Sequence, residues 1–307
     1  MAKSLFLPAP TEVQLLAYPR GPLKRVKPEV LFSMDTLRRA WLKVKAAGGG
    51  AGVDGVTIDR FETNLEANLA KLQQEVLSGS YRPRPVKRLL APKPKGGLRP
   101  LALWTLRDKV VQRVVTDCIE PYFERQFLPC SFGFRPGRSI AQVVQVIIAH
   151  REAHRRWAAN IDIKDCFDSL DPELLLHFVR QQVTDPLILK LITAWLKARI
   201  FNDLSGLKAT AGASQGAVIS PLLSNIYLHQ IDLALTQQGS ALVRYADNLL
   251  ICCRRKEEAQ QALQATATAL RQVRLELNPY KSCVVHFDQG FQFLGVFFLK
   301  NEYFYLK

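Results

Sequence analysis

The sequence predicts an α+β fold, and three patterns support this prediction. Four segments are expected to form helices, at 33–47, 59–77, 106–123 and 140–156. Residues 160–164 alternate polar and apolar side chains, as a strand with one buried face does. Two short apolar segments, 241–246 and 249–253, flank an Asp-Asn pair that favours a hairpin turn. Helices and antiparallel strands are therefore expected in the same chain.

The first helix is expected to follow an irregular arm. Up to about Pro28 the chain is rich in proline and basic residues and shows no periodicity. Apolar residues then recur at helical spacing from Ser33, and the pattern ends at the glycines 48–50. The glycine-rich segment 48–57 lacks the spacing of a phosphate-binding loop, so we interpret it as a flexible turn between helices.

A hairpin with a cationic tip is predicted between the second and third helices. From Tyr81 to Leu103 basic and apolar residues alternate around Pro-Lys-Gly-Gly, which interrupts the strand pattern. Lys93 lies at this tip and Arg99 follows it. A basic turn exposed to solvent is the plainer interpretation of the segment taken alone.

Asp162 stands out in the strand predicted at 160–164. Ile161 and Ile163 point to one face of that strand, so Asp162 faces away from the core that they enter. Asp168 and Asp171 follow, and Pro172 suits the first turn of a helix. These two acids are more often helix caps than metal ligands.

A loop leads into an apolar helix within 213–228. Gln215, Ser220 and Asn225 form a polar set at its entrance, where backbone N–H groups can meet an anion or a base. A buried helix that starts at Ser-Pro is the alternative. The Asp247-Asn248 pair that follows would by itself be only a turn. Together with Asp162 it provides the carboxylates that a two-metal phosphoryl-transfer site requires.

The composition favours a partner that is a polyanion. The chain has 307 residues, with 42 Lys and Arg against 27 Asp and Glu, a net charge of +15. Such a surface attracts nucleic acid. We find no basic amphipathic helix of the kind that binds membrane surfaces, so no membrane partner is expected.

The cysteines and the chain start predict a cytoplasmic protein. The six cysteines show neither zinc-site spacing nor the density of a disulfide scaffold, so buried thiols in a reducing compartment are expected. The N-terminal apolar run is too short for a signal peptide, and no segment reaches membrane-spanning length.

Eight short motifs occur in a characteristic order. They are Gly52-Val53-Asp54-Gly55, Arg99-Pro100-Leu101, the Ser-Phe-Gly-Phe-Arg-Pro-Gly-Arg-Ser run at 131–139, Asp162-Ile163-Lys164-Asp165-Cys166-Phe167-Asp168, Gln215-Gly216 with Ser220-Pro221, Tyr245-Ala246-Asp247-Asn248, Leu277-Asn278-Pro279 with Lys281, and Phe293-Leu294-Gly295. Together they resemble the motifs of group II intron-type reverse transcriptases, from about residue 48 to 295.

This resemblance implies a right-hand polymerase architecture with fingers, a palm and an antiparallel palm sheet. It divides the chain into an N-terminal extension at 1–50, a fingers-palm region at 51–300 and a truncated tail at 301–307. The family's group II members continue into a helical thumb, so a thumb that is absent or truncated is expected here. The resemblance then predicts poor processivity unless a partner supplies the clamp.

The resemblance also implies RNA-directed DNA polymerase activity, with an RNA template, a DNA or RNA primer and deoxynucleotides as partners. Mg²⁺, or Mn²⁺, is the implied cofactor. The implied metal ligands are Asp162, Asp247, Asn248 and the carbonyl of Ile163. The catalytic set adds Lys281. The implied nucleotide contacts are Lys93, Arg99, Phe167 and Gln215, with Phe167 excluding a 2′-hydroxyl. The implied primer grip is Phe293, Leu294 and Gly295.

Asn248 departs from the family, which has aspartate at this position. An amide oxygen can bind a metal but brings no charge, so a catalytically impaired RNA-binding relative is the alternative to an active polymerase. The CRISPR-associated branch of the family offers a context for a short form. There an adaptation integrase would be the partner, and antiviral defence would be the role.

Overall fold

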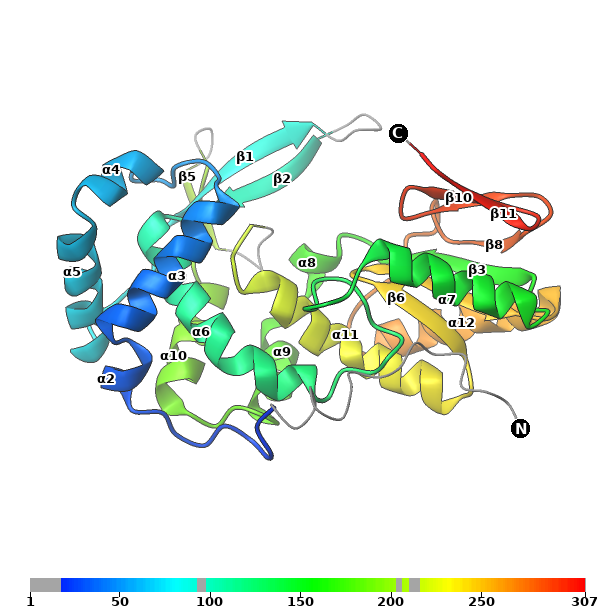
Figure 1. The fold of residues 1–307 in the computed structure, drawn as a ribbon, viewed down its shortest axis with the longest axis horizontal. Helices are drawn as coiled ribbons and strands as arrows, with labels where there is room; N and C mark the ends of the chain where they lie inside the picture. Colours follow the sequence, from blue (N-terminus) through cyan, green and yellow to red (C-terminus); the bar gives the residue numbers. More distant parts are fainter. Residues whose placement is uncertain (1–17, 93–97, 203–205, 210–215, 307) are drawn as a thin grey trace. The chain divides into compact units, whose positions relative to one another are not determined.

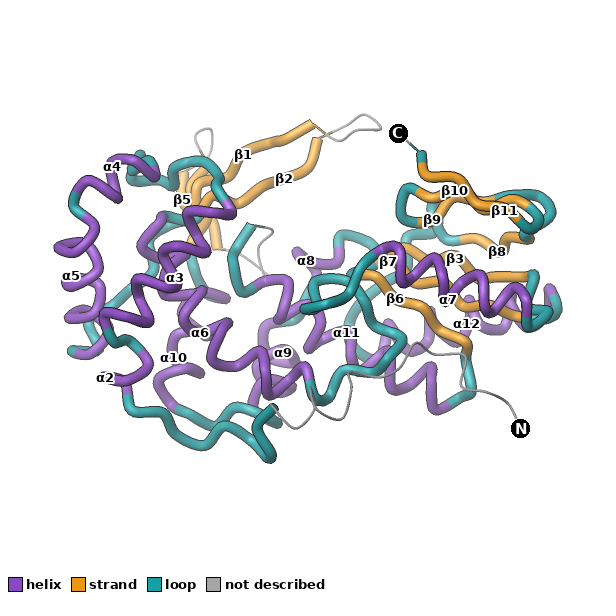
Figure 2. Tube along the Cα trace, in the orientation of Figure 1, coloured by secondary structure: helices purple, strands orange, loops and turns teal. Residues whose placement is uncertain are grey.

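The computed structural model describes residues 18–92, 98–202, 206–209 and 216–306. The chain forms two compact units (Figures 1 and 2). Unit 1 consists of 124–169 and 224–306 with Tyr18, and unit 2 of 19–123 and 170–223 within the described residues. The division falls inside the helix α11 (Ser220–Gln237). Each unit therefore combines segments that lie far apart in the sequence.

Unit 1 is built on a four-stranded antiparallel sheet with the strand order β6-β7-β3-β8. Its strands are β3 (Trp157–Asp162), β6 (Ala241–Tyr245), β7 (Asn248–Cys253) and β8 (Cys283–His286). β3 is central because it pairs with both β7 and β8. The predicted alternation holds, since Ile161 and Ile163 are buried while Asp162 is only half-buried.

Two helices cover this sheet. α7 (Ile140–Glu152) packs on β6 and β7, and α12 (Lys256–Gln272) packs on β3, β7 and β8. Figure 2 shows both helices running alongside these strands. Val143 and Ile147 of α7 belong to the same buried cluster as Leu250 and Cys252 of β7. Apolar burial of this kind stabilises the unit by about 25 cal/mol per Å² removed from water.

A second, three-stranded sheet completes unit 1. It is formed by β9 (Phe291–Phe293), β10 (Val296–Leu299) and β11 (Glu302–Tyr305), in the order β11-β10-β9. Three of its aromatic side chains, Phe291, Phe293 and Phe298, are buried in the cluster that α7 also enters. Unit 1 also contains the four-residue helix α8 (Cys166–Ser169) and most of α11.

Unit 2 is mainly helical. Its described helices are α2 (Pro28–Leu31), α3 (Met34–Ala47), α4 (Ile58–Thr63), α5 (Leu65–Leu77), α6 (Leu106–Glu124, all but its last residue), α9 (Pro172–Arg180) and α10 (Pro186–Leu196). Its strands are β1 (Val86–Pro92), β2 (Leu98–Leu103), β4 (Arg199–Asn202) and β5 (Gly206–Ala209), in the order β2-β1-β4-β5.

Several local predictions are confirmed. The Ser33 side chain caps α3 through the backbone N–H of Thr36, and Asp171 caps α9 through the N–H groups of Glu173 and Leu174. β1 and β2 form the predicted antiparallel hairpin, although its tip with Lys93 lies outside the described residues. β6 and β7 form the predicted hairpin around Asp247.

Two helix predictions were wrong in their bounds. The helix expected at 59–77 is broken at Asn64, which leaves the helical backbone region with φ −122° and ψ 38°. The side chain of Asn68 donates to the carbonyl of Phe61 at 2.9 Å, which satisfies an acceptor freed by the break. The helix expected at 140–156 ends at Glu152, because His154 takes a left-handed conformation with φ 61°.

Within the glycine segment 48–57, Gly52 is buried against another part of the backbone. A Cβ added at Gly52 would lie 2.7 Å from the backbone nitrogen and Cα of Thr105. Only glycine allows this close approach of two backbone segments. The prediction of buried thiols also fails in part, since Cys283 is exposed and Cys118 is half-buried. Among the described residues, no helix has the length and apolar character needed to span a bilayer.

Candidate active site

The register of unit 1 brings the predicted acids together. Asp162, the last residue of β3, is paired with Asn248, the first residue of β7. The Ile163 N–H donates to the carbonyl of Asp247 at 3.3 Å. Asp247 itself lies in the β6–β7 turn, after Ala246 with φ 55°. Residues separated by more than 80 positions therefore meet at one end of the sheet.

A third segment fixes the backbone and the side chain of Asp162. The N–H of Asn278 donates to the Asp162 carbonyl at 2.7 Å, and the Asp162 N–H donates to Ser282 Oγ at 3.2 Å. Asn278 Nδ2 also donates to Asp162 Oδ1 at 3.2 Å. Lys281 Nζ lies 3.4 Å from the same oxygen. The predicted catalytic residues Asp162 and Lys281 are thus in direct contact.

Electrostatics at this site favour a bound cation. Burial raises the pKa of Asp247 above its usual value, and the negative charge of Asp162 raises it further. A divalent cation would offset the repulsion between the two carboxylates. Within the described residues no three His, Cys, Asp or Glu side chains gather as a metal site. Neutral oxygen donors can add to two carboxylates in binding a divalent cation.

Two such donors are adjacent. Asn248 Nδ2 donates to Asp247 Oδ1 at 3.0 Å, which leaves the amide oxygen of Asn248 to bind a cation. The carbonyl oxygen of Ile163 is the second, on the residue whose N–H donates to the Asp247 carbonyl. Carboxylate, amide and carbonyl oxygens are the ligands that Mg²⁺ prefers, so the residues present fit this ion.

A buried arginine supports the turn that carries Asp247. Arg244 is fully buried, and its guanidinium donates to both carboxylate oxygens of Asp232, at 2.7 and 2.6 Å. It also donates to Asn225 Oδ1 at 2.9 Å, to Ser131 Oγ at 2.7 Å and to the carbonyl of Ala246 at 3.0 Å. The charged group therefore holds the backbone immediately before Asp247.

The sequence analysis selected Asn225 but missed Arg244 and Asp232. The signal was present, since Arg244 interrupts the otherwise apolar strand at 241–246. A buried charge is rare without a partner, so an arginine at that point predicts a buried acid nearby. Asp232 could have been found from this reasoning, because it lies on the helix that precedes the strand.

The segment 130–135 packs along the same turn. The Phe132 N–H donates to the Arg244 carbonyl and the Arg244 N–H donates to the Cys130 carbonyl, both at 2.8 Å. A Cβ added at Gly133 would overlap the backbone nitrogen of Ala246. Asn225 Nδ2 donates to the Gly133 carbonyl at 2.8 Å. The motif at 131–139 is therefore a support of the Asp247 turn.

The other predicted residues belong to several different elements. Phe167 is on α8, half-buried, and its ring contacts that of Phe134. Phe293 is buried in the core cluster, whereas Leu294 and Gly295 form the β9–β10 turn and reach the surface. The backbone of Arg99 is in β2 of unit 2. Lys93 and Gln215 lie outside the described residues.

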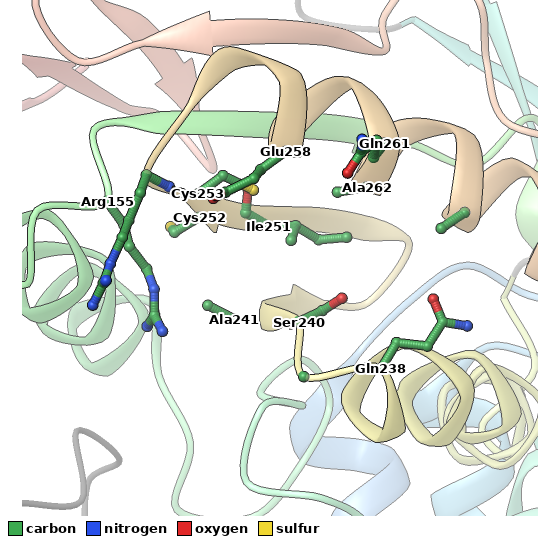
Figure 3. A pocket seen from close by; sticks show the side chains of 13 residues that line it. Arg155, Gln238, Ser240, Ala241, Ile251, Cys252, Cys253, Glu258, Gln261 and Ala262 are labelled. Atoms are coloured by element: carbon green, nitrogen blue, oxygen red, sulfur yellow. Dashed lines mark hydrogen bonds between the residues drawn. The ribbon is translucent and has the colours of Figure 1, made fainter. Parts of the chain in front are cut away.

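A hollow of about 440 Å³ lies at the other end of β6 and β7 (Figure 3). Its lining includes Arg155, Ser240, Cys252 and Glu258. Ala241 pairs with Cys252 at this end, whereas Tyr245 pairs with Asn248 at the end with the acids. The hollow is therefore separate from the carboxylate site, and none of the predicted site residues lines it.

Comparison with known proteins identifies the class. Residues 91–298 match the family described as "Reverse transcriptase (RNA-dependent DNA polymerase)". The match covers more than half of the chain. The chain therefore belongs to the reverse transcriptase family.

Two curated relatives illustrate this membership. Protein YkfC of Escherichia coli is 31% identical over 283 residues, which cover 80% of this chain and 74% of YkfC. The group II intron-encoded protein LtrA of Lactococcus lactis is 36% identical over 185 residues. That match covers 60% of this chain and 31% of LtrA, so the matched part spans about a third of the length of LtrA.

The chain also resembles solved structures at lower identity. Telomerase from Candida tropicalis, truncated from its C-terminal domain, has a TM-score of 0.51 at 13% identity, over 69% of this chain and 52% of the telomerase chain. A chain of a partial Cas6-RT-Cas1–Cas2 complex has a TM-score of 0.46 at 23% identity. That match covers 80% of this chain and 41% of the other.

Proposed function

We propose that the chain is an RNA-directed DNA polymerase that adds deoxynucleotides to a primer 3′ end by two-metal-ion phosphoryl transfer. The observation that supports this most strongly is the pairing of Asp162 with Asn248 beside Asp247, at one end of the antiparallel sheet. Magnesium bound there would activate the primer 3′-oxygen and stabilise charge on the leaving pyrophosphate. Asp162, Asp247, the Asn248 amide and the Ile163 carbonyl would hold it.

The other residues have separate roles in this proposal. Lys281, 3.4 Å from Asp162 Oδ1, would place positive charge beside the triphosphate and could donate a proton to the leaving group. Phe167 would lie beneath the sugar and exclude a 2′-hydroxyl. Lys93 and Arg99 would bind the incoming triphosphate, and Gln215 would contact the incoming nucleotide or its template partner. Leu294 and Gly295, with Phe293 buried behind them, would support the primer end.

The proposed partners are an RNA template, a DNA or RNA primer and deoxynucleotides. A fingers-palm region at 51–300 remains part of this proposal. An association with a CRISPR adaptation integrase stays a prediction from the motif resemblance, because a structural likeness at a TM-score of 0.46 adds no argument for it. A pull-down from a host that encodes both proteins tests it directly.

A catalytically impaired RNA-binding protein is the competing function. Asn248 favours it, because the amide brings no negative charge and donates to Asp247 Oδ1 instead. One ion contact at about 4 Å and an effective dielectric constant near 20 corresponds to about 4 kcal/mol. The complete loss of such a contact from the transition state would slow the reaction by roughly three orders of magnitude.

Primer extension on an RNA template separates the two functions. The purified chain is given deoxynucleotides in Mg²⁺ and then in Mn²⁺, and is compared with Asp247→Ala and Asn248→Asp. We expect extension by the native chain, no extension by Asp247→Ala, and extension up to about a thousandfold faster by Asn248→Asp. Glu276→Ala is the matched control, because Glu276 is an exposed acid that pairs with Lys164 rather than with the site.

The outcomes discriminate between the candidates. Extension by the native chain that persists in Asp247→Ala would overturn the assigned site. Extension only after Asn248→Asp would mean that the native chain binds nucleic acid without copying it. If neither protein extends a primer, while both bind primer and template, the polymerase proposal fails for the isolated chain.

A further inference from the structure

Phe134 has an unusual combination of backbone and side-chain environment. Its φ is 60°, in the left-handed region that is uncommon for a bulky residue. The residue is 48% exposed, so burial does not compensate for this conformation. Backbone strain that persists in a folded chain is held by the surrounding structure and clusters at functional sites. The surroundings of Phe134 show what holds it.

Both neighbours of Phe134 are anchored. Gly133 lies against the backbone of Ala246 so closely that no Cβ fits, and its carbonyl accepts from Asn225 Nδ2. Arg135 is buried, donates to the carboxylate of Glu124 and also donates to two backbone carbonyls. Phe134 therefore cannot relax without moving the support of the Asp247 turn on one side or a buried ion pair on the other.

The ring of Phe134 contacts Phe167. The ring centroids are 6.2 Å apart and the planes are inclined at 67°, which is an edge-to-face aromatic pair. Phe167 lies on α8, which has only four residues, and Asp165 just before it has φ 42°. A single short turn fixes a side chain weakly, so a ring packed against Phe167 restricts where that side chain can lie.

We propose that Phe134 is a specificity-determining residue that positions Phe167 and so sharpens the exclusion of ribonucleotides. This inference rests on the proposed function, in which Phe167 lies beneath the sugar. The left-handed backbone at Phe134 directs its ring away from the unit core and against Phe167. The strain at Phe134 is thus retained because the Phe134 ring positions the Phe167 ring, which meets the 2′ position of the sugar.

The first test is a double-mutant cycle on sugar selectivity. The ratio of deoxynucleotide to ribonucleotide incorporation is measured for Phe134→Ala, Phe167→Ala and the double variant. An aromatic pair contributes about 0.5–1.5 kcal/mol beyond area burial, so Phe134→Ala should lower the ratio by about two- to tenfold. Phe134→Tyr keeps an aromatic ring at this position, so its selectivity ratio should equal that of the native chain. In the Phe167→Ala background, Phe134→Ala should have no further effect.

A second test uses the backbone strain. Phe134→Gly should lower the selectivity ratio while leaving the thermal unfolding midpoint equal to or above that of the native chain, because glycine adopts a positive φ without strain. His154→Gly is the matched control, since His154 is an exposed residue with φ 61° in the turn before β3. That variant should retain the unfolding midpoint and leave selectivity unchanged.

A binding measurement separates failure of this inference from failure of the proposed function. A primer that ends in a dideoxynucleotide allows nucleotide binding without reaction. The affinities of dATP and ATP for the protein–primer–template complex then give the same ratio even if the chain extends no primer. The inference is overturned if Phe134→Ala weakens both nucleotides equally, or if its effect persists unchanged in the Phe167→Ala background.

Discussion

At the scale of single residues, the site depends on a fully satisfied buried arginine. A guanidinium has five N–H donors. Those of Arg244 donate to both carboxylate oxygens of Asp232, to Asn225 Oδ1, to Ser131 Oγ and to the Ala246 carbonyl. Lysine could not replace it, because an ammonium has three donors without the planar fork that meets both oxygens of Asp232. The backbone before Asp247 is therefore fixed by one side chain.

Arg244→Met should lower the free energy of unfolding by about 3–5 kcal/mol, because it leaves the Asp232 carboxylate buried without its partner. Replacing both residues, as in Arg244→Met with Asp232→Leu, should recover part of that loss. Urea denaturation, followed by circular dichroism, measures the free energy of unfolding of the single and the double variant. If Arg244→Met were as stable as the native chain, the buried Asp232 carboxylate would not require Arg244 as its partner.

His150, near the end of α7, makes a pH-dependent contribution to the stability of the fold. Burial and, to a lesser extent, the positive charge of Arg155 together lower the pKa of its imidazole from 6.5 to about 4, and Arg155 Nη1 lies 2.9 Å from His150 Nδ1. The unfolded chain therefore binds a proton between pH 6.5 and 4 that the folded chain does not. Stability from this group is fully present above pH 6.5 and is lost as the pH falls towards 4.

We expect the free energy of unfolding to fall by at most about 3 kcal/mol over that interval on account of His150. His150→Gln cannot take up the proton, so its stability should fall less steeply with decreasing pH. Denaturation midpoints at several pH values between 7 and 4 give the two slopes. Equal slopes for the native chain and the variant would contradict the assignment.

At the scale of elements, the site is assembled by the contact between the segment at 130–135 and the β6–β7 turn. Gly133→Ala tests this contact, because the added Cβ would overlap the Ala246 backbone and must displace the turn. Substitutions that force a backbone shift cost about 1–3 kcal/mol. We expect a lower unfolding midpoint and a loss of primer extension that exceeds what the reduced folded fraction explains.

A matched variant is Gly137→Ala, at a glycine with nothing within 4 Å of an added Cβ but with φ 69°. It carries backbone strain in the same motif without touching the turn. Extension per folded molecule should therefore be retained in Gly137→Ala and lost in Gly133→Ala. Equal losses in the two variants would mean that the motif as a whole, rather than the Gly133 contact, supports the turn.

Element positions were more predictable from the sequence than their contacts. Ser33, Asp171 and the apolar alternation around Asp162 are local signals, and the corresponding elements formed as expected. Asn64 and His154 ended helices early, because a single residue outside the helical region outweighs continued apolar spacing. Local patterns record propensity and periodicity, and they contain little about such breaks.

At the scale of the whole molecule, the limits of sequence interpretation were in register and packing. The strand of Asp162 and the turn of Asp247 were each predictable, whereas their pairing depends on tertiary contacts between segments far apart in the chain. The same applies to Gly52 and Gly133, whose close backbone contacts no spacing reveals. Motif order suggested a common site, and the geometry of unit 1 gave the neighbours Asn278, Ser282 and Arg244.

The net charge of +15 predicts how binding should depend on salt. Phosphate contacts release counterions, so the logarithm of the affinity falls linearly with the logarithm of the salt concentration, with a slope of about −0.7 per contact for single strands. Six contacts would therefore give a slope of about −4. Fluorescence anisotropy with a labelled RNA of about 20 nucleotides, titrated at several salt concentrations, measures it.

Asp247→Ala serves as the control for this measurement, because it removes a proposed metal ligand and no cation that could meet a phosphate. We expect its slope to equal that of the native chain even where primer extension is lost. A slope near zero for the native chain would show that the positive charge does not bind the nucleic acid backbone, and would contradict both the polymerase and the RNA-binding proposals. A steep slope shared by both proteins would leave catalysis at Asp247 as the property that distinguishes them.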